Sequence, residues 1–506
     1  MGPILFAIVA ILISPFLTYY VTSTLFFRTA NNKTTSKRPP TVPYLLPGLF
    51  SAGGLARSGA RKYFAELFKD YGSFSPFKVR AGLQSYVLLR DPIHISRVLD
   101  APEHLTAKGV RAEALDKIFG SSTAAKHFAK DETFLQHDTT LAAATEEYIS
   151  ILSANMHDKM FQFDTWTRIE DLWSFLQLVL LRCTSETLFG PTLLKKYPRM
   201  VRDYLKFDAA TDGYVHGMPR LMLSDASKPR NLLHAGLKEW SATAYSGTEM
   251  AGLETVRNHL RSSHSGDAKE VDSKAMVAEM LHIIHTTNSG LLSSTFWMAV
   301  ESLRKSHLSR KMTATVRQHF SPITHKYDIA GLSQEPLMGS FQTEVHRLRT
   351  ATCTVRINET NGFPLDKHWS LRKGDAVAMF SHDLSLNANV WKKAQPESLA
   401  RPLEEFWAER FLTPNRKSRK VAPEEIFEPG GLGDLVTRLT KLDDYPGHGF
   451  IAALRMATIA VLFAEFEVQI CDEDQLDAAL PPVNELAFGT VKPLEKAAVR
   501  IRKRRT

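Results

Sequence analysis

Tyr445-Pro-Gly-His-Gly-Phe450 opens the stretch that decides the fold, and an apolar run follows it as far as Phe466. Proline and glycine break the chain before the run, and the run is rich in alanine and leucine and long enough for a buried helix. Arg455 and Glu465 interrupt it, and it is too short to cross a membrane. We therefore expect a tight turn, then a core helix, then a strand that includes Glu467-Val-Gln-Ile470.

The composition is that of a globular protein. The chain has 506 residues, of which 44% are hydrophobic and 23% are charged, and this length allows a sizeable core. Its net charge of +9 is spread along the chain, and the dense basic cluster Arg500–Arg505 lies at the C-terminal end, where such a run is typical of a solvated tail and sometimes of a membrane-surface contact, so we expect no nucleic-acid partner. Three cysteines, Cys183, Cys353 and Cys471, indicate a reducing compartment rather than a disulfide framework.

The N-terminus predicts a membrane anchor. Residues 3–27 carry no charged side chain and, as a helix, exceed the thickness of a bilayer; Pro15 would kink such a helix without excluding it. The start is not basic and the apolar segment is longer than that of a cleaved signal peptide. We predict a single-pass transmembrane anchor over residues 1–28 in the endoplasmic reticulum membrane, a basic, proline-rich hinge over 29–50, and one cytosolic domain over 51–506.

Local patterns predict further elements of this domain. They are a helix over 56–71, a hairpin of strands 74–79 and 84–89, a helix from Asp91-Pro92 to near Leu99, and a long helix over 166–189. Residues 212–272 are mixed in character and indicate surface helices and loops.

Three charged residues carry a motif. Glu344 and Arg347 stand three apart, so they share a helix face and can pair, although such a pair alone is a weak signal. Phe406-Trp-Ala-Glu-Arg410-Phe follows, and then the Pro-Gly turn and the apolar helix. This order resembles the core of the cytochrome P450 family, the haem-thiolate monooxygenases. The resemblance covers most of the chain and implies a mainly α fold with small β-sheets, in which Glu344, Arg347 and Arg410 form a buried structural triad.

The helical pattern over 280–300 resembles the family helix that crosses the distal pocket with an Ala-Gly-x-Asp/Glu-Thr motif. Ser289-Gly-Leu-Leu-Ser293 occupies that frame. Leu292 stands where the family has a proton-delivering carboxylate, whereas Ser293 keeps a hydroxyl. A core helix with a polar seam is the alternative interpretation. The substrate pocket that the resemblance implies is lined by Asn288, Ser289, Gly290, Leu292 and Ser293.

His282 and His285 share a face of this helix, but two histidines without a third ligand predict pocket histidines rather than a metal site.

The loop before the last long helix departs from the family pattern at four positions. The family has Phe, Gly, a basic residue and the axial Cys where this chain has Arg438, Lys441, Asp443 and Tyr445. Tyrosine can ligate ferric haem as phenolate but lacks the electron push of thiolate. Lys441 puts a side chain where the backbone should pass under the porphyrin, and Asp443 would repel the haem propionates. We therefore predict that no haem is bound, and that Tyr445 is the axial ligand if haem binds.

Three functions remain open. The hinge and the helix end Phe296-Trp297 resemble fungal family members of secondary metabolism, and the first function is a haem-free, redox-neutral enzyme of that kind. It would hold a lipophilic terpenoid or polyketide for cyclisation, Diels-Alder cycloaddition or isomerisation, with Ser293 and Tyr445 as candidate hydrogen-bond donors. The second is a haem-dependent monooxygenase with a non-cysteine axial ligand and a reductase partner. The third is a non-catalytic relative that binds small molecules.

Overall fold

The structure is a computed structural model of the chain. The structure describes residues 2–32, 34, 37–45, 60–71, 75–81, 84–107, 116, 118–120, 138–215, 224–244, 252–264, 273–414, 425–427, 431–440, 448–483 and 489–504.

Helices make up most of the described chain. They are α1 Gly2–Asn31, α3 Ala60–Tyr71, α4 Pro92–Leu99, α7 Asp138–Met156, α8 Leu172–Phe189, α9 Thr192–Lys196, α10 Met200–Val215, α11 Ser224–Ala244, α12 Glu254–His264, α13 Ser273–Leu303, α14 Ser306–Gln318, α15 Ile329–Gln334, α16 Pro336–Arg349, α17 Ser381–Leu386, α18 Ala388–Ala394, α19 Leu432–Thr440, α20 His448–Glu465 and α21 Glu473–Ala479.

The strands form small sheets. They are β1 Phe77–Ala81, β2 Gln84–Leu89, β3 Leu105–Thr106, β4 Thr167–Ile169, β5 Phe320–Ser321, β6 Lys326–Tyr327, β7 Thr350–Ala351, β8 Cys353–Asn358, β9 Phe363–Pro364, β10 Ser370–Leu371, β11 Ala376–Phe380, β12 Leu412–Pro414, β13 Glu425–Phe427, β14 Phe466–Ile470, β15 Gly489–Thr490 and β16 Val499–Lys503. The largest sheet has the order β1-β2-β11-β8-β3, and β14-β16-β4 form a second one. The expected mainly α architecture with small sheets is thus confirmed.

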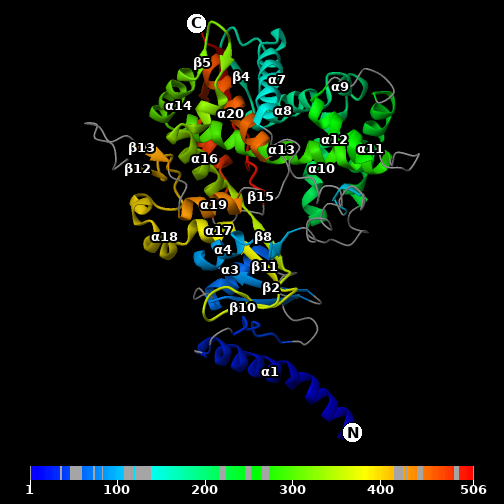
Figure 1. Cartoon of the computed structure of the whole chain (residues 1–506), viewed down its shortest axis with the longest axis vertical. Coiled ribbons are helices and arrows are strands. Elements are labelled where there is room, and N and C mark those ends of the chain that lie inside the picture. The colour runs from blue at the N-terminus through cyan, green and yellow to red at the C-terminus, as the bar shows by residue number, and fades with distance from the viewer. Residues whose placement is uncertain are drawn as a thin grey trace.

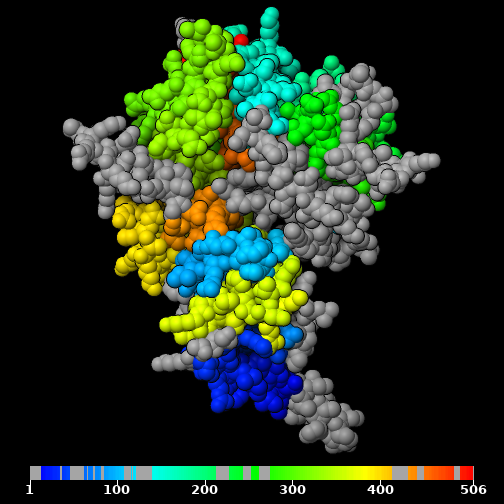
Figure 2. Space-filling view, viewed as in Figure 1, coloured from blue at the N-terminus to red at the C-terminus, as the bar shows by residue number. Residues whose placement is uncertain are grey.

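The helical body is centred on α13, a helix of 31 residues. From residue 275 to residue 302 its side chains are buried except at positions 285, 289 and 290, because α8, α11, α16 and α20 pack around it. The five-stranded sheet forms a smaller lobe with α3 and α4, and this lobe lies between the helical body and α1 (Figure 1). The space-filling view shows the same division into a wide body and a narrower part that contains the blue N-terminal residues (Figure 2).

Several predicted elements are confirmed. β1 and β2 form the antiparallel hairpin, and α4 ends at Leu99 as expected, with Asp91 as its N-cap accepting from the amide of Ile93. The strand after the last long helix is β14. The predicted helix over 166–189 is wrong at its start. Residues 167–169 pair with β16 as β4, and the side chain of Asp171 then caps α8.

The predicted anchor coincides with α1, whose side chains are described from Ile13 onward. Its C-terminal end packs on the lobe, since the rings of Phe26 and Tyr71 lie 4.9 Å apart. Large apolar side chains earlier in α1 are open to solvent, with Phe16 74% and Tyr20 71% exposed. Within the described chain, no helix combines the length and apolarity that a membrane crossing requires.

Candidate active site

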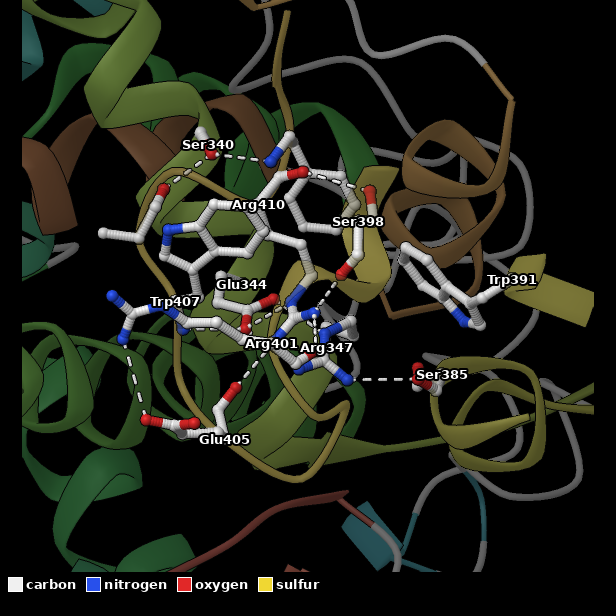
Figure 3. A network of polar contacts seen from close by, with 12 residues as sticks. Ser340, Glu344, Arg347, Ser385, Trp391, Ser398, Arg401, Glu405, Trp407 and Arg410 are labelled. Carbon is white, nitrogen blue, oxygen red and sulfur yellow. Dashed lines mark hydrogen bonds and ion pairs between the residues drawn. The ribbon is translucent and has the colours of Figure 1, made fainter. Parts of the chain in front are cut away.

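Glu344 joins α16 to the segment before β12 (Figure 3). Arg347 donates from Nε to Glu344 Oε2 at 2.7 Å and from Nη2 to Oε1 at 2.9 Å. Arg410 donates from Nε to Oε1 at 2.9 Å, and the amide of Trp407 donates to the same oxygen at 3.0 Å. The three charged side chains have no exposed surface. We call Glu344, Arg347 and Arg410 the brace; the structure brings together the three residues that the sequence order singles out.

The brace also orders the main chain around it. Ser340 adds a further link, since its hydroxyl donates to the carbonyl of Ala408 at 2.6 Å and accepts from the amide of Phe411 at 3.1 Å. The remaining guanidinium nitrogens of Arg410 donate to the carbonyls of Ser398, Arg401, Pro402 and Glu405, and Arg347 donates to the carbonyl of Ser385. Two buried cations thus hold α17 and the segment of residues 398–405 against α16.

Charge balance keeps Glu344 ionised. Burial by itself raises the pKa of a carboxyl group, because the charged form loses its hydration. Arg347 and Arg410 outweigh this effect by charge and by hydrogen bonding, so the pKa of Glu344 lies below its ordinary value. Burial lowers the pKa of the Arg410 guanidinium in turn, and Glu344 opposes that shift.

The five residues of the predicted pocket do not share one environment. Ser289 and Gly290 are partly exposed, whereas Leu292 and Ser293 are each 4% exposed. Asn288 is fully buried; its Oδ1 accepts from the hydroxyl of Thr184 at 2.8 Å, and its amide donates to the carbonyl of Ile284. Asn288 therefore holds α13 against α8, and the structure does not bring its side chain to the same surface as Ser289 and Gly290.

A partly exposed surface remains where α13 meets the start of α20. We use the name accessible strip for the partly exposed residues of these two segments, Ser289 and Gly290 of α13 and Gly449, Ile451, Ala452 and Ala453 of α20, which approach each other at Gly290 and Ile451. A Cβ atom built on Gly290 would meet only Cγ2 of Ile451, at 3.9 Å. The glycine thus leaves space beside an apolar wall, as a site for a lipophilic molecule requires.

One helical turn beyond Ile451, α20 carries a buried arginine. Arg455 is 2% exposed, and its Nη1 donates to the hydroxyl of Ser294 at 3.3 Å and to Nε2 of His346 at 3.1 Å. Burial lowers the pKa of the Arg455 guanidinium to about 10, which leaves it charged at neutral pH. Sequence reasoning identifies Arg455 only as an interruption of the apolar run and misses it as a site residue. The signal that could have identified it is a lone arginine within a helix rich in alanine and leucine.

The two histidines of α13 lie among aromatic rings. His282 is 2% exposed and its ring centroid lies 5.0 Å from that of Phe119. His285 Nδ1 lies 3.4 Å from the hydroxyl of Tyr204 and 3.9 Å from a carboxylate oxygen of Asp208. No cluster of three or more histidine, cysteine or acidic side chains suited to a metal ion occurs in the described part of the chain.

A mainly helical body with small sheets, a Glu-Arg-Arg brace and a long glycine-bearing helix packed on the last long helix are consistent with a cytochrome P450 fold. No protein-family model matches the chain. It is 23% identical to the cytochrome P450 monooxygenase fsoE of Humicola fuscoatra, over 93% of this chain and 88% of that protein. It is also 23% identical to the cytochrome P450 monooxygenase efuG of Hormonema carpetanum, over 92% and 90% of the two chains. The chain is a divergent relative of these fungal monooxygenases.

The cysteines of the chain do not fit a haem-thiolate centre. Cys183 lies in α8, Cys353 in β8, and Cys471 follows β14, so the sequence has no cysteine in the turn directly before α20. Tyr445, at the axial position, lies outside the described residues, as do Lys441 and Asp443. Arg438, at the position of the family's Phe, belongs to α19 and pairs with Asp100 at 2.9 Å. The described residues at this place therefore supply no thiolate ligand.

Proposed function

We propose that this chain is a P450-related enzyme of fungal secondary metabolism that converts a lipophilic terpenoid or polyketide by redox-neutral chemistry without haem. The observation that carries the proposal is the replacement of the axial cysteine by Tyr445, in a chain that keeps the complete brace. The brace residues of the fold are kept, whereas the cysteine that would ligate a haem iron for oxygen activation is lost. Function depends on the site rather than on the fold, so a new activity on this scaffold is expected.

The accessible strip supports a role in shaping a substrate. Ile451 carries a larger side chain than the neighbouring Ala452 and Ala453, and it faces Gly290 across the strip. The larger side chain narrows the space and adds apolar contact, which favours one conformer of a flexible substrate. Holding a reactive conformer can accelerate cyclisation, cycloaddition or isomerisation without any cofactor. Ser289 is the hydroxyl of the strip, whereas the earlier candidate Ser293 is buried beneath it.

The second candidate function is a haem-dependent monooxygenase with Tyr445 as axial ligand. It is supported by the relatives, which are monooxygenases by name, and by the space beside Gly290. Haem would supply oxygen activation, and a reductase would then be the partner. A phenolate gives less push to O–O cleavage than a thiolate does, and Leu292 removes a proton donor.

An absorption spectrum of the purified protein, expressed with haem precursor, separates the two functions. The redox-neutral proposal predicts folded protein with no stoichiometric Soret band. A stoichiometric Soret band would refute it, and Tyr445→Phe would then test ligation, because loss or a marked shift of the band would implicate the phenolate. Folded, haem-free protein would next be assayed for isomers formed from lipophilic pathway intermediates, and binding without conversion would favour the non-catalytic interpretation.

We also propose that α1 associates with the endoplasmic reticulum membrane and leaves the domain in the cytosol. The support is the apolar sequence of residues 3–27 together with the exposure of Phe16, Leu17 and Tyr20, at 74%, 59% and 71%. Neighbouring large apolar side chains on a surface indicate an interaction site.

A further inference from the structure

Arg455 is a buried charge that the brace does not use. Its two hydrogen-bond partners, Ser294 and His346, are not carboxylates. A guanidinium can only donate, so His346 must accept through Nε2 and is neutral in this arrangement. In the described part of the chain, no ion pair includes Arg455.

The two remaining donor nitrogens of Arg455, Nε and Nη2, lie on the same edge of its guanidinium group. Its Nε and Nη2 are buried and donate to no group in the structure as described. These nitrogens lie on one side of the planar guanidinium, in the fork geometry that matches the two oxygens of a carboxylate.

Other buried arginines of the chain have such a partner. Arg347 and Arg410 share Glu344, and Arg349 donates to Glu301 at 2.6 Å. An ion that is buried without a counter-charge carries a large desolvation cost. A counter-charge for Arg455 that comes from a bound molecule would offset this cost.

The position of Arg455 connects it to the accessible strip. Ile451 and Arg455 are one turn apart on α20, and they face Gly290 and Ser294, which are one turn apart on α13. Gly290 and Ile451 border the accessible strip, whereas Ser294 and Arg455 are buried. The backbone of Arg455 therefore lies about one helical turn, about 5 Å, further along the same helix–helix contact.

We propose that the Nε–Nη2 edge of Arg455 binds the carboxylate of a lipophilic small molecule that enters at the accessible strip. This inference rests on the proposed function and names its substrate class, an apolar carboxylic acid. A porphyrin propionate offers the same chemistry, so it is the second source of the carboxylate.

The test compares acids with their esters on the full-length protein in detergent. The probes are abietic acid with methyl abietate, and protoporphyrin IX with its dimethyl ester, measured by calorimetry and thermal shift. We expect the abietic acid to bind at least ten-fold more tightly than its ester, and Arg455→Met to abolish that preference. An Arg455-dependent preference confined to the porphyrin pair would assign the carboxylate to a propionate. Lack of acid preference in both pairs, or a preference that survives in Arg455→Met, overturns the proposal.

Stability without any ligand provides a second test. Arg455→Met removes an uncompensated buried charge, so its Tm should equal or exceed that of the wild type. The matched control is Arg349→Met, which leaves Glu301 with only Arg304 at 3.4 Å and should lower the Tm. If Arg455→Met lowers the Tm as much as the control does, the chain itself compensates Arg455 and the proposal fails.

A Soret band would refute the haem-free function but would not change the acid–ester comparison with abietic acid. Failure of the proposed function and failure of this inference are therefore distinguishable.

Discussion

Glu344→Gln removes the one negative charge of the brace while keeping the shape of the side chain. Glu344 accepts four hydrogen bonds, two from Arg347, one from Arg410 and one from the amide of Trp407. The glutamine amide group would face a guanidinium donor, and two buried cations would lose their counter-charge. Breaking a buried pair on one side costs about 3–5 kcal/mol. The unfolding entropy of a chain of 506 residues is about 1 kcal/mol per degree, so we expect a Tm drop of about 3–5 °C.

Thermal unfolding followed by circular dichroism measures this difference, with Glu405→Gln as the control. Glu405 lies 3.7 Å from Arg401, and the two side chains are 50% and 45% exposed. Such a surface pair contributes less than about 1 kcal/mol, so the control should change the Tm by less than about 1 °C. If Glu344→Gln costs no more than the control, Glu344 does not compensate the two arginines and the brace argument is refuted.

The pH dependence of the same variant has a defined sign. The folded pKa of Glu344 lies below its ordinary value of 4.5, so its contribution to stability is complete above pH 4.5. That contribution is lost as the pH falls through the folded pKa, because the carboxylate is then protonated. The difference in Tm between wild type and Glu344→Gln should therefore shrink on acidification below pH 4.5. A difference that stays constant to pH 2 would show that charge is not the cause.

Two further predictions concern α11 and α1. Burial, with Arg230 and Lys274 nearby, lowers the pKa of His234 to about 4 from an ordinary 6.5, so stability falls as the pH drops from 6.5 through 4, by at most about 3 kcal/mol. His234→Gln should flatten the Tm between pH 6.5 and pH 4, and an unchanged slope would contradict this assignment. Deletion of residues 2–28 should move the chain from the membrane fraction to the supernatant on cell fractionation; equal partitioning of both forms would refute the membrane proposal.

The elements that local chemistry decides were predictable from the sequence. Asp91 before Pro92 specifies the start of α4, because a carboxylate caps the first amides and proline is tolerated in the first turn. The start of α8 was not predictable, since helical periodicity runs through residues 167–169. These residues instead pair with β16, which is more than three hundred positions away. Local periodicity contains no information on such a partner.

In the candidate site too, contacts that follow from residue spacing along one helix were predictable, whereas contacts that depend on how a helix is rotated about its axis were not. Glu344 and Arg347 pair because three positions place them on one helix face, and the family order supplied Arg410. The side chain of Asn288 instead bonds Thr184 of α8, because the rotation of α13 about its axis is set by all the helices packed around it. The importance of Arg455 likewise depends on which carboxylates the fold places near it, and a sequence does not specify that.

The brace and Arg455 differ in a way that bears on the proposed change of activity. Every partner of Glu344 and Arg410 in the brace is a group of the protein, so these contacts stabilise the scaffold whether or not a cofactor is bound. Loss of the axial cysteine therefore leaves the brace intact, and the fold can persist while the chemistry changes. Arg455 has the opposite property, because its buried charge finds no carboxylate among the described residues and weakens the fold that contains it. A charge that is costly to the fold and lies beside the accessible strip is explained by ligand binding rather than by stability.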